Sequence, residues 1–371
     1  MWVILSPIFK PVGATCNLRC NYCFYKNNRP EGIFIMSDIV LKKAMFQLVQ
    51  ASPEGIHFYW HGGEPLLAGL RFYRKAVEFQ LQICPQNYKV WNSIQTNGTL
   101  LNQEWVDFFK EHKFGVGISL DGPEEIHDKC RKFLSGEGTF RSVMKAIELL
   151  AKNSMKVSCL GVATRYSLGK AEEIFNFFYQ NGLFSFDLSP CFNKDEYGIS
   201  PLEYADFMIE IFDIFMDIDD PRVNIRFFDN MISSFFGGNA TVCSMANQTS
   251  CGLFPTIDWN GDVYFCDNYY EDNNSFYLGN LLKDEISFML KSPLYKKILQ
   301  DIKRFQAELG CLNCEVSKIC GGGCPRYWFW REDRFSQCSA RRKIVSHVIG
   351  RITSIIDKVT GNEKDEEKGM D

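Results

Sequence analysis

Three cysteines lie within eight residues near the start of the chain, in the segment CNLRCNYC. Cys16, Cys20 and Cys23 have no fourth cysteine or histidine beside them in the sequence. A structural zinc site takes four protein ligands, whereas three thiolates hold a [4Fe–4S] cluster with one iron open to a small molecule. The spacing therefore favours a ligand-binding iron–sulfur cluster over structural zinc or incidental thiols.

A second and denser group of cysteines lies in the C-terminal third of the chain. Its eight thiols suffice for two clusters with four thiolate ligands each, whereas a single zinc ribbon would leave four thiols unexplained. Two zinc sites stay open as an alternative, because ligand softness does not separate zinc from iron–sulfur clusters. The eight members are Cys243, Cys251, Cys266, Cys311, Cys314, Cys320, Cys324 and Cys338.

The elements that must position the first cysteines follow from a repeated pattern between about residues 50 and 190. Strand-like runs there alternate with helical patterns, which predicts a parallel α/β sheet, open or curled into a partial barrel. Polar, glycine-rich segments follow three of the strands, so the active edge should be the C-terminal edge of the sheet. The predicted strands are 56–62, 89–98, 114–122, 156–164 and 184–190, and the predicted helices are 70–83, 102–112, 139–153 and 170–182.

The rest of the chain divides around this repeat. The apolar opening MWVILSPIFK is too short for a membrane helix and contains Pro7, so it predicts a first strand. A helix-rich connection covers 201–236, and the Gly-, Asn- and Cys-rich sequence beyond it predicts a small loop-rich domain held by metal. We therefore expect a barrel domain at 1–236, a metal-binding domain at 237–355 and a charged, disordered tail at 356–371.

Composition limits the classes of function. The chain has 371 residues, a net charge of −4 and no basic stripe, which argues against a nucleic-acid partner, and nothing indicates a membrane. Fifteen cysteines without a signal peptide point to the cytoplasm, where clustered thiols more often bind metal than form disulfides. The four cysteines without ligand spacing are expected to be buried apolar thiols: Cys84, Cys130, Cys159 and Cys191.

The C-x3-C-x2-C motif after a first predicted strand, with GGEP at 62–65, resembles the radical SAM superfamily. This resemblance implies a partial (β/α)6 TIM-like barrel whose open cluster iron chelates S-adenosylmethionine (SAM) and cleaves it to methionine and a 5′-deoxyadenosyl radical. Taken singly, GGEP would be a turn, Ser119 a strand-end cap and Arg131 a surface charge. The implied SAM contacts are Tyr22 and Phe192 at adenosine, Gly63 near the methionine amino group, Ser119, and Arg131 on the carboxylate.

The C-terminal cysteines resemble the SPASM domain, whose C-x2-C-x5-C-x3-C motif and final cysteine are matched by CLNCEVSKICGGGC and Cys338. The resemblance implies two auxiliary [4Fe–4S] clusters with interleaved ligands, and so three clusters in all. One auxiliary cluster would use Cys243, Cys251, Cys266 and Cys324, and the other Cys311, Cys314, Cys320 and Cys338.

Within that superfamily the chain looks closest to anaerobic sulfatase-maturating enzymes, through KPVGATCNLRCNYCFY, GGEPLLAGL, QTNGTL, GISLDGPEEIH, IRFFDNMI and VYFCDNYY. Those enzymes oxidise a cysteine or serine of an unfolded sulfatase segment to formylglycine. The resemblance implies a peptide or unfolded protein substrate, a flavodoxin- or ferredoxin-type reductant and a monomer. Two features depart from it: His61 stands where glutamine is usual, and Cys243 and Cys251 are spaced more widely.

The resemblance also makes Asp267 the general base, next to the proposed ligand Cys266. Burial near thiolates should raise the pKa of Asp267 and improve it as a base. The structural alternative is an Asx-type turn, because FCDNYYEDNN is rich in turn-forming residues.

Two other functions stay open. A maturase of ribosomally made peptides would install a thioether, a cyclophane or an inverted residue by the same radical start. Many such enzymes carry an N-terminal leader-binding domain, and a first ligand at Cys16 leaves no room for one. A non-catalytic electron carrier or zinc scaffold would not need GGEP, Ser119 or Arg131 around an open three-cysteine site.

Overall fold

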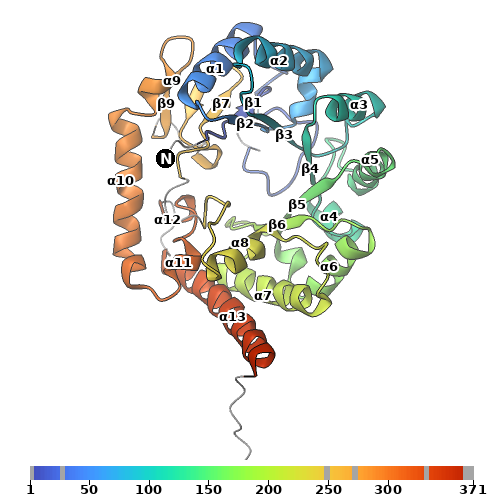
Figure 1. Ribbon diagram of the computed structural model, residues 1–371. Helices are drawn as coiled ribbons and strands as arrows, with labels where there is room; N and C mark the ends of the chain where they lie inside the picture. Colours follow the sequence, from blue (N-terminus) through green and yellow to red (C-terminus); the bar gives the residue numbers. More distant parts are fainter. Residues whose placement is uncertain (1–3, 26–29, 246–250, 270–274, 330–333, 362–371) are drawn as a thin grey trace, which may run out of the picture.

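The computed structural model describes residues 4–25, 30–245, 251–269, 275–329 and 334–361. Its centre is one sheet in which six neighbouring strands run parallel, with their helices on the outside (Figure 1). This confirms the predicted partial barrel. The six strands are β1 (Ile8–Lys10), β2 (Ile56–Trp60), β3 (Val90–Thr96), β4 (Gly115–Ser119), β5 (Val157–Ala163) and β6 (Phe186–Pro190).

The helices around the barrel form where the apolar period predicts them. In α5 the buried residues Val143, Ala146, Ile147 and Leu150 recur at helical spacing and face the sheet. The helix α7 begins with a capping box, in which the Ser200 and Glu203 side chains each bond to the other's backbone. The helices are α1 (Asp38–Ala51), α2 (Gly69–Ile83), α3 (Gln103–Glu111), α4 (Glu124–Cys130), α5 (Phe140–Lys152), α6 (Ala171–Gln180), α7 (Pro201–Ile218) and α8 (Arg226–Phe235).

Aromatic side chains fill much of the space between the sheet and α2 and α3. Phe9 of β1 and Trp60 of β2 are fully buried with ring centroids 5.0 Å apart, and Trp60 meets Tyr73 of α2 edge-on at 5.3 Å. Buried aromatic pairs of this kind add stability beyond the area that they bury. This packing fixes β1 and β2, the two strands that lead into the cysteines and into GGEP.

The sheet does not break at the expected domain boundary after residue 236. Strand β7 pairs in parallel with β1, and β8 and β9 continue the sheet in antiparallel fashion. The C-terminal part is also less loop-rich than the sequence suggested, since α10 has 16 residues and α13 has 27. Its elements are β7 (Thr256–Asp258), β8 (Asp262–Tyr264), β9 (Tyr277–Asn280), α9 (Ile286–Met289), α10 (Pro293–Glu308), α11 (Ser317–Cys320), α12 (Arg326–Phe329) and α13 (Arg334–Thr360).

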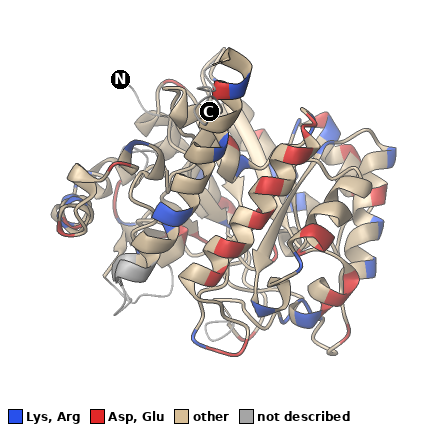
Figure 2. Ribbon diagram, turned by 90° about the horizontal axis from the view of Figure 1, so that it is seen from below, with Lys and Arg blue, Asp and Glu red and all other residues tan. Residues whose placement is uncertain are grey.

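Helix α13 packs along α7 of the barrel. Its residues Ile344, Val345 and Val348 are buried, and three ion pairs border the contact. Figure 2 shows the basic positions of α13 beside the acidic positions of α7. The pairs are Lys343 with Asp206, His347 with Asp213 at 2.8 Å, and Arg351 with Asp217.

The end of α13 revises the expected tail. The helix continues to Thr360, so residues 356–360 are helical rather than disordered. The rest of the expected tail, 362–371, lies outside the described residues. Within the described part of the chain, every helix is too short or too polar to span a bilayer.

Candidate functional site

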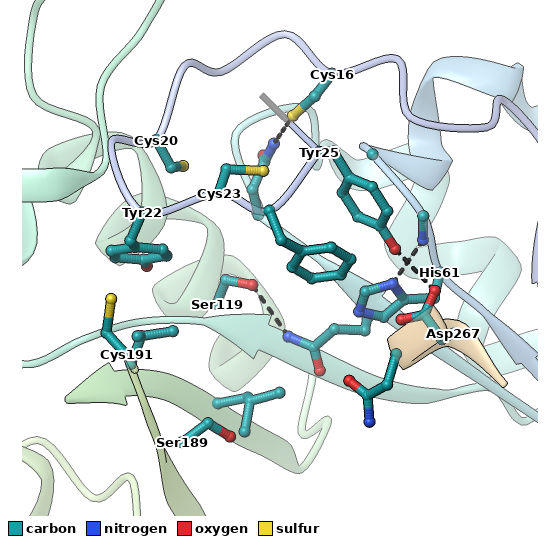
Figure 3. Close-up of a pocket in the computed structure, with 18 of the residues that line it drawn as sticks. Cys16, Cys20, Tyr22, Cys23, Tyr25, His61, Ser119, Ser189, Cys191 and Asp267 are labelled. Carbon is teal, nitrogen blue, oxygen red and sulfur yellow. Dashed lines mark hydrogen bonds between the residues drawn. The ribbon is translucent and has the colours of Figure 1, made fainter. Parts of the chain in front are cut away.

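A cavity of about 600 Å³ opens at the C-terminal ends of the parallel strands, at the edge that the sequence predicted. Ser119 is the last residue of β4, Thr96 the last of β3 and Pro190 the last of β6, and all three line it. The volume is typical of sites for cofactor-sized ligands. The candidate site residues that line it are Cys16, Cys20, Tyr22, Cys23, His61, Gly63, Ser119, Arg131, Phe192 and Asp267 (Figure 3).

The three N-terminal thiols sit on one loop, residues 16–23, which we call the cysteine loop. The backbone N–H of Leu18 and the side-chain amide of Asn97 donate hydrogen bonds to Cys16 Sγ at 3.4 and 3.7 Å. Donors of this kind stabilise a thiolate that ligates a metal. Cys191, expected to be an apolar core thiol, also lines the cavity, from the segment that follows β6. The cysteine loop thus presents three thiols to a space large enough for a cluster and its ligand.

Glycine at position 63 is required by close packing against the chain that enters the cysteine loop. A Cβ at Gly63 would lie 1.9 Å from the carbonyl oxygen of Thr15. The Gly63 N–H donates to the Gly13 carbonyl at 2.8 Å, and the Glu64 N–H donates to the Thr15 carbonyl at 2.8 Å. The GGEP segment therefore fixes the chain that leads into the cysteine loop. This close packing requires glycine at position 63, and the sequence alone did not reveal it.

The substitution Gly63→Ala should displace the cysteine loop, because the added methyl overlaps backbone that has no room to move. We expect loss of the N-terminal cluster and of SAM cleavage, with the auxiliary iron retained, measured as iron content and 5′-deoxyadenosine after anaerobic reconstitution. Gly350→Ala is the control, since a Cβ there meets nothing within 4 Å and alanine favours the helix. Full iron content and cleavage in Gly63→Ala would contradict the packing argument.

Glu64, the acidic residue of GGEP, lies behind the cavity wall and joins two strand ends. It is fully buried and accepts hydrogen bonds from Thr96 Oγ1 at 2.6 Å and from the backbone N–H of Asn97 at 2.8 Å. Burial raises the pKa of Glu64 to about 7, although these hydrogen bonds favour the ionised carboxylate and lower its pKa. Because Asn97 also bonds to Cys16, Glu64 links the ends of β2 and β3 to the first thiol of the cysteine loop.

Arg131 is held in the cavity wall by Asp121, which the sequence analysis did not single out. Asp121 accepts a hydrogen bond from Arg131 Nε at 3.1 Å and from the Tyr22 hydroxyl at 2.7 Å. The guanidinium also lies 5.5 Å from the centre of the Tyr22 ring. Burial disfavours the charged guanidinium, but the Asp121 carboxylate outweighs it and raises the pKa of Arg131. A fixed positive charge therefore faces the site.

The two other candidate SAM contacts come from different strands, because Ser119 ends β4 and Phe192 follows β6. Ser119 Oγ accepts a hydrogen bond from Gln95 Nε2 at 3.1 Å. Phe192 packs edge-on against Tyr204 of α7 and Tyr327 of α12, with ring centroids 5.8 and 5.0 Å apart. Tyr327 lines the cavity too, so the site is built by both expected domains.

Asp267 faces the cavity as one member of a buried charged network (Figure 3). Its carboxylate accepts a hydrogen bond from the Tyr25 hydroxyl at 2.8 Å and forms a 2.5 Å ion pair with Lys10 Nζ, whose side chain is fully buried. Burial alone would raise the pKa of Asp267, but Lys10, His61 and Tyr25 together hold it at about 2. The expected rise in its pKa is therefore wrong, and the carboxylate is ionised at neutral pH.

His61 lines the cavity next to this network. Its Nδ1 accepts a hydrogen bond from the Gly62 N–H at 2.6 Å, so the neutral ring carries its proton on Nε2. Burial lowers the pKa of His61, with Asp267 opposing that shift. A histidine that ends a strand and bonds only to backbone would be structural, but His61 also lies in the cavity wall, where it can contact SAM or the peptide.

The eight C-terminal cysteines fall into the two groups that the resemblance implied. We call the set that contains Cys251 the first auxiliary set and the other the second. Burial raises the pKa of Cys251 to about 12, and the nearby thiols of Cys324 and Cys243 add to this shift. Asn268 Nδ2 donates a hydrogen bond to Cys324 Sγ at 3.7 Å. The second auxiliary set lines a small cavity of about 20 Å³. The first set is Cys243, Cys251, Cys266 and Cys324, and the second is Cys311, Cys314, Cys320 and Cys338.

The number of thiols in each auxiliary set fits an iron–sulfur cluster. Each set supplies four thiols, which is the number of thiolate ligands that a [4Fe–4S] cluster takes.

Comparisons with known proteins agree with this geometry. A family model of the radical SAM superfamily matches residues 11–177, and one of an iron–sulfur cluster-binding domain matches residues 243–315. The cysteine-type anaerobic sulfatase-maturating enzyme of Clostridium perfringens (strain 13 / Type A) is 30% identical over 372 residues, covering 96% of this chain and 99% of that enzyme. The serine-type enzyme of Bacteroides thetaiotaomicron is 32% identical over 354 residues, covering 88% and 84%.

Among solved structures, native anSMEcpe with bound AdoMet and Cp18Cys peptide superimposes with a TM-score of 0.84 at 29% identity. The match covers 96% of this chain and 100% of that one. Sequence and structure are thus shared over nearly the whole length, including both cysteine-rich regions. The chain belongs to the radical SAM superfamily and, within it, to the family of anaerobic sulfatase-maturating enzymes.

Proposed function

We propose that this enzyme oxidises a cysteine or serine of an unfolded sulfatase segment to formylglycine, with SAM and three [4Fe–4S] clusters as cofactors. The observation that carries the proposal is one cavity in which the cysteine loop and the ionised Asp267 both line the wall. The similar anSMEcpe structure holds both AdoMet and a peptide, which supports a site shared by the two ligands.

On this proposal, Cys16, Cys20 and Cys23 hold the SAM-binding cluster. When bound, that cluster supplies the electron that cleaves SAM to methionine and a 5′-deoxyadenosyl radical. Arg131, fixed by Asp121, offers its terminal NH2 groups to the SAM carboxylate, since its Nε already donates to Asp121. The remaining contacts with SAM are assigned to Tyr22, Gly63, Ser119 and Phe192, all of which line the cavity.

Asp267 takes the proton that the substrate loses. After hydrogen abstraction from the substrate β-carbon, completing the oxidation removes one electron and one proton. The auxiliary cluster that the first set would hold would supply the electron acceptor. The substrate thiol or hydroxyl becomes a much stronger acid as its carbon loses the electron, so an ionised carboxylate of low pKa suffices as the acceptor. Lys10 and Tyr25 hold the carboxylate in place, and its neighbour Cys266 belongs to the first auxiliary set.

The partners and the compartment complete the proposal. We assign the two auxiliary sets to two [4Fe–4S] clusters and expect a flavodoxin- or ferredoxin-type reductant. None of the 15 cysteines, all of which lie among the described residues, forms a disulfide, and this supports a reducing compartment, the cytoplasm. We expect the enzyme to act as a monomer.

The test is turnover of a peptide of the form Cys-x-Pro-x-Arg, and of its serine counterpart, by the reconstituted enzyme with SAM and a reductant. The serine peptide should become lighter by two hydrogens. The cysteine peptide should lose two hydrogens and then exchange sulfur for oxygen by hydrolysis. A peptide with alanine at the reacting position is the control. Deoxyadenosine without product would favour a ribosomal-peptide maturase, and no deoxyadenosine at all would rule out both.

His61→Gln should change the affinity for SAM or peptide without changing the iron content. One altered hydrogen bond in a buried site is worth about 1.4 kcal/mol, so we expect a change in KM of up to about tenfold. His57→Gln is the matched control, because His57 lies on β2, the strand that His61 follows, bonds to Ser93 Oγ at 2.8 Å and does not line the cavity. Unchanged constants on every peptide would leave His61 a structural residue.

A further inference from the structure

One arginine of α13 contacts both auxiliary sets. Arg341 Nε donates to Cys320 Sγ at 3.4 Å, and its Nη2 donates to the Cys320 carbonyl at 2.8 Å. The same Nη2 lies 3.3 Å from the carbonyl oxygen of Ser244, which follows Cys243 in the sequence. Since Cys320 belongs to the second set and Cys243 to the first, the guanidinium bridges the two.

The glycine run between Cys320 and Cys324 makes room for this bridge. A Cβ at Gly323 would lie 3.0 Å from Arg341 Cδ, and a Cβ at Gly321 would lie 2.2 Å from the carbonyl oxygen of Met245. Both glycines have positive φ angles, of +79° and +61°. The run therefore carries the chain from one auxiliary set to the other while passing close to Arg341.

The neighbouring Arg342 differs from Arg341 in its exposure and in its ion pair. Arg342 also lines the small cavity, but it pairs with Glu315 at 3.3 Å and its side chain is 53% exposed. Solvent and Glu315 therefore screen its charge. Arg341 is only partly exposed, and no carboxylate of the described residues pairs with it, so its charge acts on the cysteine sulfurs.

The first auxiliary set has a weaker donor. Asn268, a neutral amide, donates to Cys324 Sγ at 3.7 Å. A charged donor forms a hydrogen bond about twice as strong as a neutral one. The second set receives the charged donor directly on a sulfur, whereas Arg341 reaches the first set through the Ser244 carbonyl and through electrostatic attraction to Cys324, without a hydrogen bond to its sulfur.

We propose that Arg341 raises the reduction potential of the second auxiliary cluster relative to the first. Reduction adds negative charge to a cluster, and a cation that donates to a ligand sulfur stabilises the reduced form. The difference in potential would then favour an electron on the second cluster, away from the cavity that holds Asp267. This inference rests on the proposed cluster ligands and not on the identity of the peptide.

The experiment is a potentiometric titration of the reconstituted enzyme, monitored by electron paramagnetic resonance, without substrate. The second cluster is identified as the signal that a Cys311→Ala protein lacks. In Arg341→Met its reduction equilibrium should become about tenfold less favourable, which for one electron is a fall of about 59 mV. Arg342→Met, the matched control, should give a clearly smaller fall, because Arg342 interacts with Cys314 and Cys338 only electrostatically, from an exposed position and while paired with Glu315. Arg341→Gln, which keeps an N–H donor without the charge, should also give a smaller fall than Arg341→Met.

Three results would overturn the proposal: an unchanged potential in Arg341→Met at full iron content, an equal shift of both auxiliary clusters, or an equal shift in Arg342→Met. If Arg341→Met loses iron, the titration of Arg341→Gln decides by the same criteria. Because no peptide is present, failure to oxidise a sulfatase peptide would leave this result intact. An unchanged potential would likewise leave the proposed peptide chemistry untouched.

Discussion

The triple variant Cys16→Ala, Cys20→Ala, Cys23→Ala should form no 5′-deoxyadenosine, while much of its auxiliary iron stays bound. The three thiols lie on one loop at the large cavity, whereas the auxiliary sets have their own cysteines elsewhere. Loss of any single thiol removes a cluster ligand or opens a second iron, so each single variant should be inactive as well. Iron and sulfide content and deoxyadenosine by chromatography measure the two effects separately.

Cys84→Ala serves as the control for the triple variant. Cys84 is only half-buried at the end of α2 and lines neither cavity, so its loss should change neither iron content nor SAM cleavage. Deoxyadenosine from the triple variant would show that the SAM site is elsewhere in the chain. Loss of all iron would instead show that the auxiliary sites depend on the first cluster.

Asp267→Asn should cleave SAM at a rate close to the wild type and lose most peptide product. The asparagine keeps the size of the side chain but accepts no proton, so hydrogen abstraction becomes uncoupled from oxidation. Loss of a general base typically costs about 10²- to 10⁴-fold in rate. The ratio of product to deoxyadenosine, measured on one sample, reports the uncoupling directly.

Two further variants distinguish the loss of the base from a folding defect in Asp267→Asn. The single substitution removes the carboxylate of the 2.5 Å ion pair with the buried Lys10, which is destabilising, so Lys10→Met with Asp267→Asn removes both charges of the pair. Tyr25→Phe removes one hydrogen bond to Asp267 and should lower the rate less. Wild-type product formation in Asp267→Asn would place the base elsewhere and favour a different peptide chemistry.

Local patterns in the sequence were enough to predict the barrel and to single out three cysteines that line its cavity. Strand and helix periods depend on neighbouring residues, and β2 to β6 lie within the predicted ranges. The expected pKa of Asp267 failed because the deciding group, Lys10, comes from β1, far away in the chain. Asp121 was missed for a similar reason, since only the fold brings it to Tyr22 and Arg131.

The C-terminal part was harder to predict because its composition is typical of loops, although it contains long helices. Dense Gly, Asn and Cys indicated loops, yet α10 buries Ile298, Ile302 and Gln306 at a spacing of four residues. The pairing of β7 with β1 joins segments that no local pattern connects. The bridging role of Arg341 likewise depends on α13 lying across both auxiliary sets.

The packing of α13 on α7 has a consequence for how the chain is made. The paired residues of the two helices are 134 or 137 positions apart, and α13 follows all other described elements in the chain. A nascent chain therefore exposes the apolar side of α7 on the ribosome until α13 has emerged. Cys338 and Arg341 lie on that same helix. On the proposed assignment of ligands, iron–sulfur insertion at the second auxiliary site would therefore have to wait until α13 has been synthesised and has docked on α7.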